Sequence, residues 1–260
     1  MMRTLEELKK DIVEIGRLAY QKGWVAANDG NFSVRLDDNT ILCTPTMISK
    51  GMMTPDDLII VNMDGHKVSG RGERTSEIAM HLTIYSMRPD IGGVVHVHPP
   101  VATGFAVAGK PLNRAVLPEV IISLGSVPLA EYGLPGTPAL TAGMIPLIPD
   151  YDALLMASHG AVCYGRTVWD AFFKMETVEH FARINLVAEL LGGPRLLPRG
   201  EVEKLFESRS RYGISSNARM QPGNPIVAED TAAAPELPAG VSREALLALI
   251  DEALMSRSRS

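Results

Sequence analysis

The run Val94-Val95-His96-Val97-His98-Pro99 places two histidines inside an apolar segment that is typical of a buried β-strand. Because side chains alternate along a strand, we expect His96 and His98 on one face and the two inner valines on the other. Two neutral imidazoles side by side suit two of the ligands of a zinc ion. The alternative interpretation is a pair of polar residues at the end of a strand.

His159 is a candidate for a third metal ligand. With Gly160 it interrupts two apolar runs, 153–158 and 161–164, which we expect to form buried strands. A side chain at such a break can emerge at the edge of a sheet. Three protein ligands and an open fourth position are typical of a catalytic zinc site. Taken alone, a histidine at such a break is more often structural than a ligand.

A helix is predicted to open at Thr75 and to end before Pro89, with Glu77 in its first turn and His81 four residues later on the same face. Spacing alone favours a solvated Glu–His pair. A helix N-terminus, however, stabilises anions and offers free N–H groups, and the hydroxyls of Thr75 and Ser76 lie there too. The segment is therefore also a candidate phosphate pocket with a carboxylate beside it.

Short runs of small and polar residues could bring further backbone amides to an anion. They are Gly30-Asn31-Phe32-Ser33, Thr44-Pro45-Thr46 and Lys50-Gly51. Each is weak evidence alone, because such turns mostly only reverse the chain.

The rest of the pattern predicts a mixed sheet covered by helices. A capping box of Thr4 and Glu7 starts a helix that Gly23 ends, and Thr167 starts a long helix that Gly192-Gly193-Pro194 ends. The other expected elements are hairpins over 32–44 and 58–69, helices over 101–108 and 137–147, and strands with loops over 111–135.

The composition excludes several classes of protein. Of the 260 residues, 46% are hydrophobic and 21% charged, which is too apolar for a disordered chain. A net charge of −5 does not provide the basic face of a dedicated nucleic-acid binder. No run of about 18 apolar residues occurs, so no membrane-spanning helix is expected.

The two cysteines, Cys43 and Cys163, lie in apolar runs and are expected to be reduced core residues in a reducing compartment. The N-terminus has no apolar segment of the kind found in secretory signals. We therefore expect a cytoplasmic protein.

Taken together, the motifs resemble the class II aldolase/adducin family, closest to L-fuculose-1-phosphate aldolase and related short-chain sugar-phosphate aldolases. The resemblance covers residues 5–213. It is carried, in order, by the Gly30 turn, Thr44-Pro45-Thr46, Thr75-Ser76-Glu77 with His81, the strand with His96 and His98, and His159-Gly160. The ordered set with matching intervals is far more specific than any one motif.

The resemblance implies a three-layer α/β/α fold with a central mixed, largely antiparallel sheet. It implies a catalytic domain over 1–213 and a homotetramer with active sites at subunit interfaces. Beyond it, the sequence predicts a Pro/Ala-rich linker over 214–240 and a C-terminal amphipathic helix and tail over 241–260. No nucleic-acid or membrane partner is expected.

The resemblance also implies the roles of individual residues. His96, His98 and His159 would bind Zn²⁺, with Mn²⁺ or Co²⁺ as alternatives. Glu77 would be the acid/base and, without substrate, a fourth ligand. The residues implied to bind substrate and its phosphate are Asn28, Gly30, Asn31, Thr46, Met47, Thr75 and Ser76.

The implied reaction is reversible retro-aldol cleavage of a ketose phosphate to dihydroxyacetone phosphate and an aldehyde, through an enediolate whose charge the metal disperses. Alternatives within the family are a ribulose-phosphate 4-epimerase, which places an aspartate where Glu77 stands, and a decarboxylase of a keto-acid phosphate. A non-catalytic, adducin-like assembly domain is the third alternative, although such domains lose the metal ligands.

The sequence departs from the family pattern at several positions. Leu117-Pro118-Glu119-Val120 stands where relatives carry a tyrosine acid, so Tyr212 becomes the candidate that closes the site, with a surface aromatic as the alternative. Met47 replaces a glycine, and Asn28 replaces a common threonine phosphate ligand. A different or unphosphorylated substrate is therefore an alternative. Lys50 could add a compensating charge, although we expect a solvated lysine.

Overall fold

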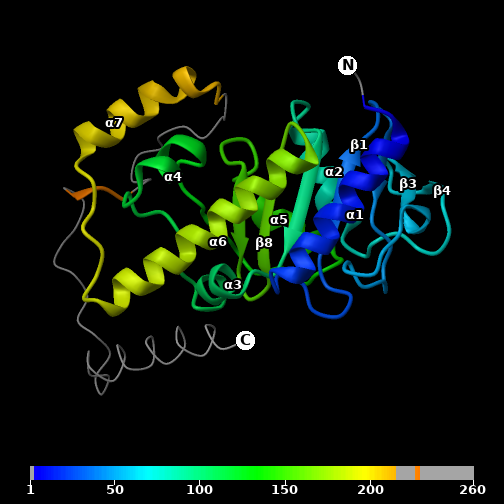
Figure 1. Cartoon of the computed structure of the whole chain (residues 1–260), viewed down its shortest axis with the longest axis horizontal. Helices are drawn as coiled ribbons and strands as arrows, with labels where there is room; N and C mark the ends of the chain where they lie inside the picture. Colours follow the sequence, from blue (N-terminus) through cyan, green and yellow to red (C-terminus); the bar gives the residue numbers. More distant parts are fainter. Residues whose placement is uncertain (1–2, 215–225, 229–260) are drawn as a thin grey trace.

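A sheet of eight strands forms the centre of the computed structural model, which describes residues 3–214 and 226–228 (Figure 1). Its order is β4-β3-β2-β1-β5-β8-β7-β6, and neighbours are antiparallel apart from the parallel pair β6 and β7. The strands are β1 Asn31–Arg35, β2 Thr40–Cys43, β3 Ile59–Asn62, β4 Lys67–Ser69, β5 Gly93–Val97, β6 Leu129–Ala130, β7 Ala153–Met156 and β8 Gly160–Gly165.

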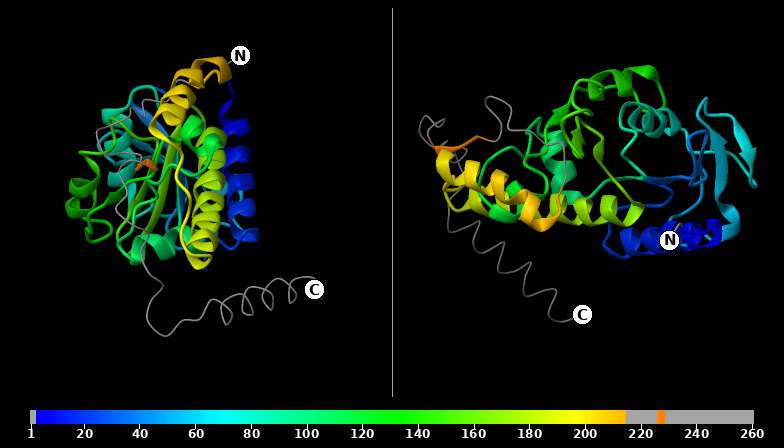
Figure 2. Two further views of the ribbon diagram at one scale, coloured as in Figure 1. Left: turned by 90° about the vertical axis from the view of Figure 1, so that its left-hand side faces the viewer. Right: turned by 90° about the horizontal axis from the view of Figure 1, so that it is seen from above.

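Helices cover both faces of the sheet (Figure 2). One hydrophobic cluster joins α1, α3 and α6 to one face, and a second joins α2 and α5 to the other. The predicted three-layer α/β/α fold is confirmed. The helices are α1 Leu5–Gln21, α2 Ile78–Met87, α3 Pro100–Val107, α4 Pro118–Ser123, α5 Pro138–Met144, α6 Val168–Leu190 and α7 Arg199–Ser208, with 3₁₀ turns η1 Pro55–Asp57 and η2 Arg209–Tyr212.

Strand β5 lies near the middle of the sheet and divides its side chains between the two cores. Val95 and Val97 belong to the cluster with α1, α3 and α6, whereas Val94 belongs to the cluster with α2 and α5. His96 alternates with the two inner valines and therefore faces the α2 side, where it is fully buried. The predicted separation of histidine and valine faces is confirmed.

The long helices begin where their caps predicted. The Thr4 hydroxyl accepts a hydrogen bond from the Glu7 N–H at the start of α1, and the Thr167 hydroxyl accepts one from Asp170 at the start of α6. Three expectations about helices were wrong or incomplete. Segment 111–135, which was expected to hold only strands and loops, contains α4. Helix α7 was not predicted. Helix α2 begins at Ile78 rather than at Thr75.

The region beyond residue 213 was predicted to be a linker and a helix. Within the described part, Ile226 donates to Asn113 O over 2.7 Å, and Ala115 N–H donates to Ile226 O over 2.9 Å. Val227 is buried beside Val202 of α7, so these linker residues pack against the domain. The predicted helix over 241–260 lies outside the described residues. Among the described helices, none combines the length and apolarity that a bilayer crossing requires.

Candidate active site

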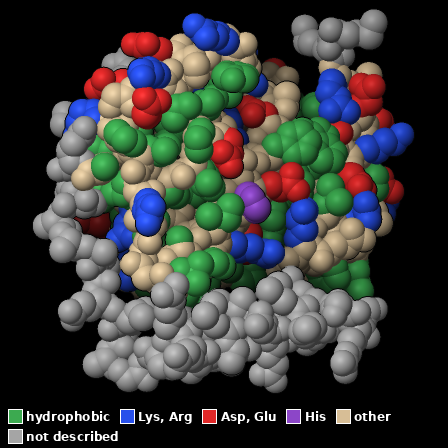
Figure 3. All heavy atoms as spheres, turned by 60° about the vertical axis from the view of Figure 1, so that its left-hand side comes forward, with side chains coloured by type: hydrophobic (Ala, Val, Ile, Leu, Met, Phe, Trp, Pro, Cys, Tyr) green, Lys and Arg blue, Asp and Glu red, His purple; other side chains and the backbone are tan. Residues whose placement is uncertain are grey.

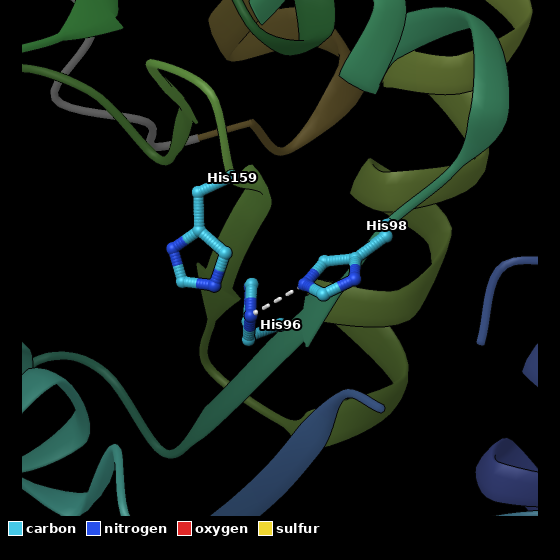
Figure 4. A group of neighbouring side chains, drawn as sticks. All are labelled: His96, His98 and His159. Atoms are coloured by element: carbon cyan, nitrogen blue, oxygen red, sulfur yellow. Dashed lines mark hydrogen bonds between the residues drawn. The ribbon is translucent and has the colours of Figure 1, made fainter. Parts of the chain in front are cut away.

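Three histidines from two separate parts of the sheet meet at one point. His96 lies near the end of β5, His98 directly after it, and His159 in the turn between β7 and β8. One ring nitrogen from each lies within 4.8 Å of the others, and Figure 4 shows the rings converging. The structure thus brings together the three residues that the sequence singled out as metal ligands.

The turn that carries His159 is shaped for this approach. Ser158 has a φ of 54°, which few residues other than glycine adopt, and it makes the turn between the strands tight. A Cβ on Gly160 would lie 2.4 Å from His98 Cδ2 and 2.8 Å from Val97 O. Only glycine at position 160 therefore lets the His159 turn pack against the end of β5.

The ring contacts of the cluster suit a bound cation. His96 Nδ1 lies 2.9 Å from Ala161 O, so in the neutral ring this nitrogen donates to the carbonyl and Nε2 has the lone pair that could bind a metal. His98 Nε2 lies only 3.3 Å from His96 Nε2. Burial and the neighbouring His96 lower the pKa of His98 to about 4 and that of His159 to about 4. Both are neutral near pH 7, as metal ligands must be.

Glu77 completes the cluster from the α2 side. Its Oε2 lies 3.3 Å from His96 Nε2 and accepts from Asn31 Nδ2 over 2.8 Å, and its Oε1 lies 3.2 Å from His159 Nε2. Burial would raise the pKa of the Glu77 carboxyl, but His96, His159 and Asn31 outweigh it and lower the pKa well below its usual range. Glu77 is therefore ionised and close enough to share a metal with the histidines.

The position of Glu77 differs from the prediction in one respect. The residue is the N-cap of α2 and does not lie in its first turn. Thr75 O accepts from the Ile78 N–H, and the Thr75 hydroxyl lies 3.3 Å from the Glu77 N–H. This hydrogen-bonded turn occupies the segment where the helix was predicted to open, and it aims Glu77 at the histidines.

A pocket of about 220 Å³ lies beside the cluster. It is bounded by the turn after α1, the turn after β2 and the turn before α2. Asp29, Lys50 and Pro135 line it together with Asn28, Gly30, Asn31, Pro45, Thr46, Thr75, Ser76, Glu77, His98 and His159. Six of the seven residues predicted to bind substrate phosphate thus share one pocket with Glu77 and two of the histidines.

The comparisons with known proteins agree with this geometry. The family model described as Class II Aldolase and Adducin N-terminal domain matches residues 10–186. This chain belongs to the class II aldolase and adducin family. Its predicted family is therefore confirmed.

Two curated relatives and one solved structure illustrate the range of this family. L-fuculose phosphate aldolase of Methanococcus maripaludis is 32% identical over 177 residues, 68% of this chain and 95% of the relative. The 3-oxo-tetronate 4-phosphate decarboxylase of Escherichia coli O6:H1 is 31% identical over 206 residues, 77% of this chain and 95% of the relative. A solved L-fuculose 1-phosphate aldolase is 27% identical with a TM-score of 0.74, covering 81% of this chain and 98% of the other. The similar proteins thus include both aldolases and decarboxylases.

In this class II aldolase family member, the two residues at which the sequence was expected to depart from the family pattern, Asn28 and Met47, lie together. Met47 is 77% exposed with a φ of 62°, a left-handed conformation that favours glycine, the residue that the resemblance implies at this position. The Asn28 amide lies 3.7 Å from Met47 Sδ. Asn28 lines the pocket, whereas Met47 is absent from its lining and stands at its rim beside Thr46.

The expectation that Lys50 is solvated was wrong. Only 1% of the residue is exposed, and its ammonium donates to Asn28 O over 3.0 Å and to Ile48 O over 2.8 Å. The ammonium thereby ties together two of the loops that form the pocket. Burial lowers the pKa of Lys50 to about 8, although the nearby Asp29 opposes this shift.

The expectation of a solvated Glu–His pair was also wrong, and Asp29 was missed. His81 is fully buried, and Asn31 lies between it and Glu77, in hydrogen-bond contact with both. Asp29 Oδ2 lies 3.5 Å from His98 Nδ1, where it can orient the ring. Asp29 directly precedes the Gly30 turn, and this place in the sequence could have identified it as a residue of the site.

Tyr212 is the one proposed catalytic residue that the described chain does not bring to its own pocket. It ends η2, is 65% exposed and is absent from the pocket lining. In the segment where the resemblance implies a tyrosine, Leu117 is the N-cap of α4 and Pro118, Glu119 and Val120 are the first residues of the helix.

Proposed function

We propose that the chain is a zinc-dependent aldehyde-lyase that cleaves a ketose phosphate of the fuculose-1-phosphate type into dihydroxyacetone phosphate and an aldehyde. The observation that carries this proposal is the juxtaposition of three histidines and one carboxylate with a pocket of hydroxyls and amides. A divalent metal held by His96, His98 and His159 would act as a Lewis acid and disperse the negative charge that develops on the substrate oxygens.

The pocket residues have the chemistry to hold the phosphate. Thr46, Thr75 and Ser76 offer hydroxyl groups, and Asn31 and Asn28 offer side-chain amides. The N-terminus of α2, which begins at Ile78, adds a partial positive charge on the same side. These contacts orient the substrate with its reacting carbons toward the histidines.

Glu77 is suited to move the proton at carbon. Asn31 holds Oε2, whereas Oε1 is buried and accepts no hydrogen bond from the described residues. The oxygen Oε1 is therefore available to accept a proton from the substrate and to return it. A carboxylate placed in this way contributes on the order of 10²- to 10⁴-fold to a rate.

A second candidate is decarboxylation of a keto-acid phosphate such as 3-oxo-tetronate 4-phosphate, the compound in the name of one relative. Both reactions leave the enediolate of dihydroxyacetone phosphate, since an aldehyde or CO₂ departs from the same carbon. In retro-aldol cleavage, a group must take the proton from the hydroxyl that becomes the aldehyde oxygen. Loss of CO₂ needs no such group. The pocket lining of the described chain includes no tyrosine for this task, which favours the second candidate unless a neighbouring subunit supplies one.

One experiment separates the two candidates. The purified protein is first analysed for metal, with about one zinc per chain expected. It is then incubated with a panel of ketose 1-phosphates and with 3-oxo-tetronate 4-phosphate, and aldehyde and CO₂ are measured. Aldehyde release supports the lyase, and CO₂ release alone supports the decarboxylase. Failure to take up metal would contradict both.

We further propose a cytoplasmic homotetramer in which the domain over 1–213 carries the active site at a subunit interface and Tyr212 closes the site of a neighbouring subunit. The exposure of Tyr212 and its absence from the lining of the pocket in its own described chain support this arrangement. The buried, unpaired thiols of Cys43 and Cys163 support a reducing compartment.

A further inference from the structure

The face of α2 that meets β1 carries polar side chains at regular spacing. Glu77, His81 and Tyr85 follow one another at four-residue intervals, which places them in one row along the helix. Asn31 and Ser33 alternate with buried apolar residues on β1 and face this row. All five are buried or nearly so, in a region otherwise formed by the hydrophobic core.

These five residues form an unbroken series of hydrogen bonds that ends on the Glu77 carboxylate. Tyr85 Oη lies 2.9 Å from Ser33 Oγ, which lies 2.6 Å from His81 Nδ1. On the other side of the ring, His81 Nε2 lies 2.5 Å from Asn31 Oδ1. Asn31 Nδ2 then donates to Glu77 Oε2 over 2.8 Å.

When the His81 ring is neutral, only one arrangement of protons satisfies every contact in this series. The Glu77 carboxylate can only accept, so the Asn31 amide nitrogen must face it and the amide oxygen must face His81. That oxygen requires a proton on His81 Nε2, which leaves Nδ1 bare for a neutral ring. Nδ1 then accepts from the Ser33 hydroxyl, and Ser33 accepts from Tyr85. Burial lowers the pKa of His81 to about 3, so the neutral ring is the form present near pH 7.

We infer that His81 is a positioning residue which, with Ser33 and Tyr85 behind it, fixes the Asn31 amide in the orientation that holds Glu77 Oε2 and leaves Oε1 directed at the substrate. This inference rests on the proposed role of Glu77. Were the Asn31 amide to rotate by half a turn, its oxygen would face the carboxylate and repel it. The register Asn31 to His96 across β1 and β5 sets Asn31 beside the histidine cluster, so the orientation of one amide affects the whole site.

The test compares His81→Leu with His81→Gln in the zinc-loaded full chain. Glutamine keeps an N–H donor near the place of Nε2, whereas leucine fills similar space without one. We expect His81→Leu to slow exchange of the carbon-bound proton of dihydroxyacetone phosphate with solvent by on the order of 10- to 100-fold, with a nearly unchanged KM and zinc content. His81→Gln is expected to restore most of the rate. Tyr85→Phe removes only the hydroxyl at the far end of the hydrogen-bond series and is expected to have a small effect on the exchange rate.

Two results would overturn the inference. One is a folded His81→Leu protein that exchanges the proton as fast as the wild type. The other is a His81→Gln protein that is as stable as the wild type but as slow as His81→Leu. A purely structural role would instead make the rate follow the loss of thermal stability in all three variants.

A measurement without substrate separates this inference from the proposed reaction. ¹⁵N NMR of histidine-labelled protein reports which nitrogen of His81 carries the proton, and we expect it on Nε2. Ser33→Ala removes the hydroxyl that donates to His81 Nδ1 and keeps the His81 ring, so it remains informative if His81→Leu does not fold. In this variant the share of the Nε2–H tautomer should fall. A proton on Nδ1 in the wild type, or a spectrum unchanged by Ser33→Ala, would contradict the inference. A wild type that lacks proton exchange but has the Nε2–H tautomer would instead contradict the proposed function.

Discussion

The two oxygens of Glu77 have different surroundings, and this difference leads to a prediction at the scale of one residue. Oε2 accepts from Asn31, and Oε1 accepts no hydrogen bond from the described chain. Glu77→Gln keeps the size and most contacts but cannot accept a proton. We expect zinc to be retained by the three histidines, and proton exchange at dihydroxyacetone phosphate to fall by about 10²-fold or more.

A matched control is Glu73→Gln, the same substitution at a side chain that is 78% exposed a few residues away. It should leave both metal content and exchange unchanged. Exchange by Glu77→Gln at the wild-type rate would remove Glu77 from its proposed role. Loss of zinc in Glu77→Gln would assign it to metal binding rather than proton transfer.

Lys50 leads to a prediction about pH. Because burial lowers its pKa to about 8 in the folded protein, the unfolded chain binds more protons than the folded one between about pH 8 and 10.5. The free energy of unfolding should therefore rise with pH across this window, by at most about 1.4 kcal/mol per unit. Lys50→Met should abolish this part of the rise, as measured by urea unfolding at several pH values.

The control for this measurement is Lys110→Met, at an exposed lysine. It should keep the pH dependence of the wild type. If the wild type and Lys50→Met show parallel curves between pH 8 and 10, Lys50 does not titrate in this window.

At the residue scale, the sequence was informative where spacing determines geometry. The alternation of side chains along β5 was sufficient to place His96 on the face opposite Val95 and Val97, and the break between two apolar runs was sufficient to place His159 in the turn between β7 and β8. The burial of Lys50 and His81 could not be derived in this way. The carbonyl of Asn28 and the side chains of β1 that surround these residues come from other elements, so spacing within their own segments carries no information about them.

At the scale of elements, Asp152 joins three parts of the fold. It precedes β7, and its carboxylate lies 2.9 Å from Arg88 Nη2, after α2, and 3.1 Å from Lys174 Nζ on α6. Asp152 and Arg88 are both almost completely buried. Asp152→Asn removes the charge that pairs with the buried Arg88 and the half-buried Lys174, and we expect a loss of about 3 kcal/mol in the free energy of unfolding.

Asp90→Asn is the matched control for Asp152→Asn. Asp90 also pairs with Arg88, but its side chain is 47% exposed, so the expected loss is below about 1 kcal/mol. Both values are obtained from chemical denaturation. Equal losses in the two variants would show that burial of the ion pair does not determine its contribution.

The elements that the sequence predicted were those with strong local signals. Helices α1 (Leu5–Gln21) and α6 (Val168–Leu190) have N-terminal caps, and each is longer than fifteen residues, which is enough for apolar residues to recur at helical spacing. Helix α4 has only six residues, too few for a helical period to emerge. Helix α7 buries only Val202, so its pattern is faint although its packing on α4 is extensive.

At the scale of the whole molecule, two large apolar side chains next to the pocket are exposed. Met47, next to the pocket residue Thr46, is 77% exposed, and Leu134, next to the pocket residue Pro135, is 58% exposed. Figure 3 shows that hydrophobic side chains also lie among charged ones on one face of the molecule. Exposed apolar side chains at the mouth of a site are well suited to contact another subunit.

The layer order and the family could be predicted from the sequence, because motifs in order and alternating patterns constrain a single chain. The expected assembly came only from the resemblance, since no pattern within one chain encodes which surfaces meet. The same limit applies to Tyr212, which is absent from the pocket lining of its own described chain. Its proposed role depends on a second subunit.

Mixing two inactive variants tests whether the active site is shared between subunits. Glu77→Gln chains lack the base, and Tyr212→Phe chains lack the proposed hydroxyl. In randomly mixed oligomers, about one quarter of interfacial sites would combine a wild-type Glu77 from one subunit with a wild-type Tyr212 from its neighbour. We therefore expect unfolding and joint refolding of the two variants to restore aldehyde release to about a quarter of the wild-type rate.

The control is each variant refolded alone, which should regain nothing beyond its own residual rate, with light scattering confirming the tetramer in every sample. If Tyr212 served the pocket of its own chain, every site in the mixture would lack one of the two groups. The mixed sample would then show only the average of the two variants. Recovery above that average thus requires that Glu77 and Tyr212 at one site come from different chains.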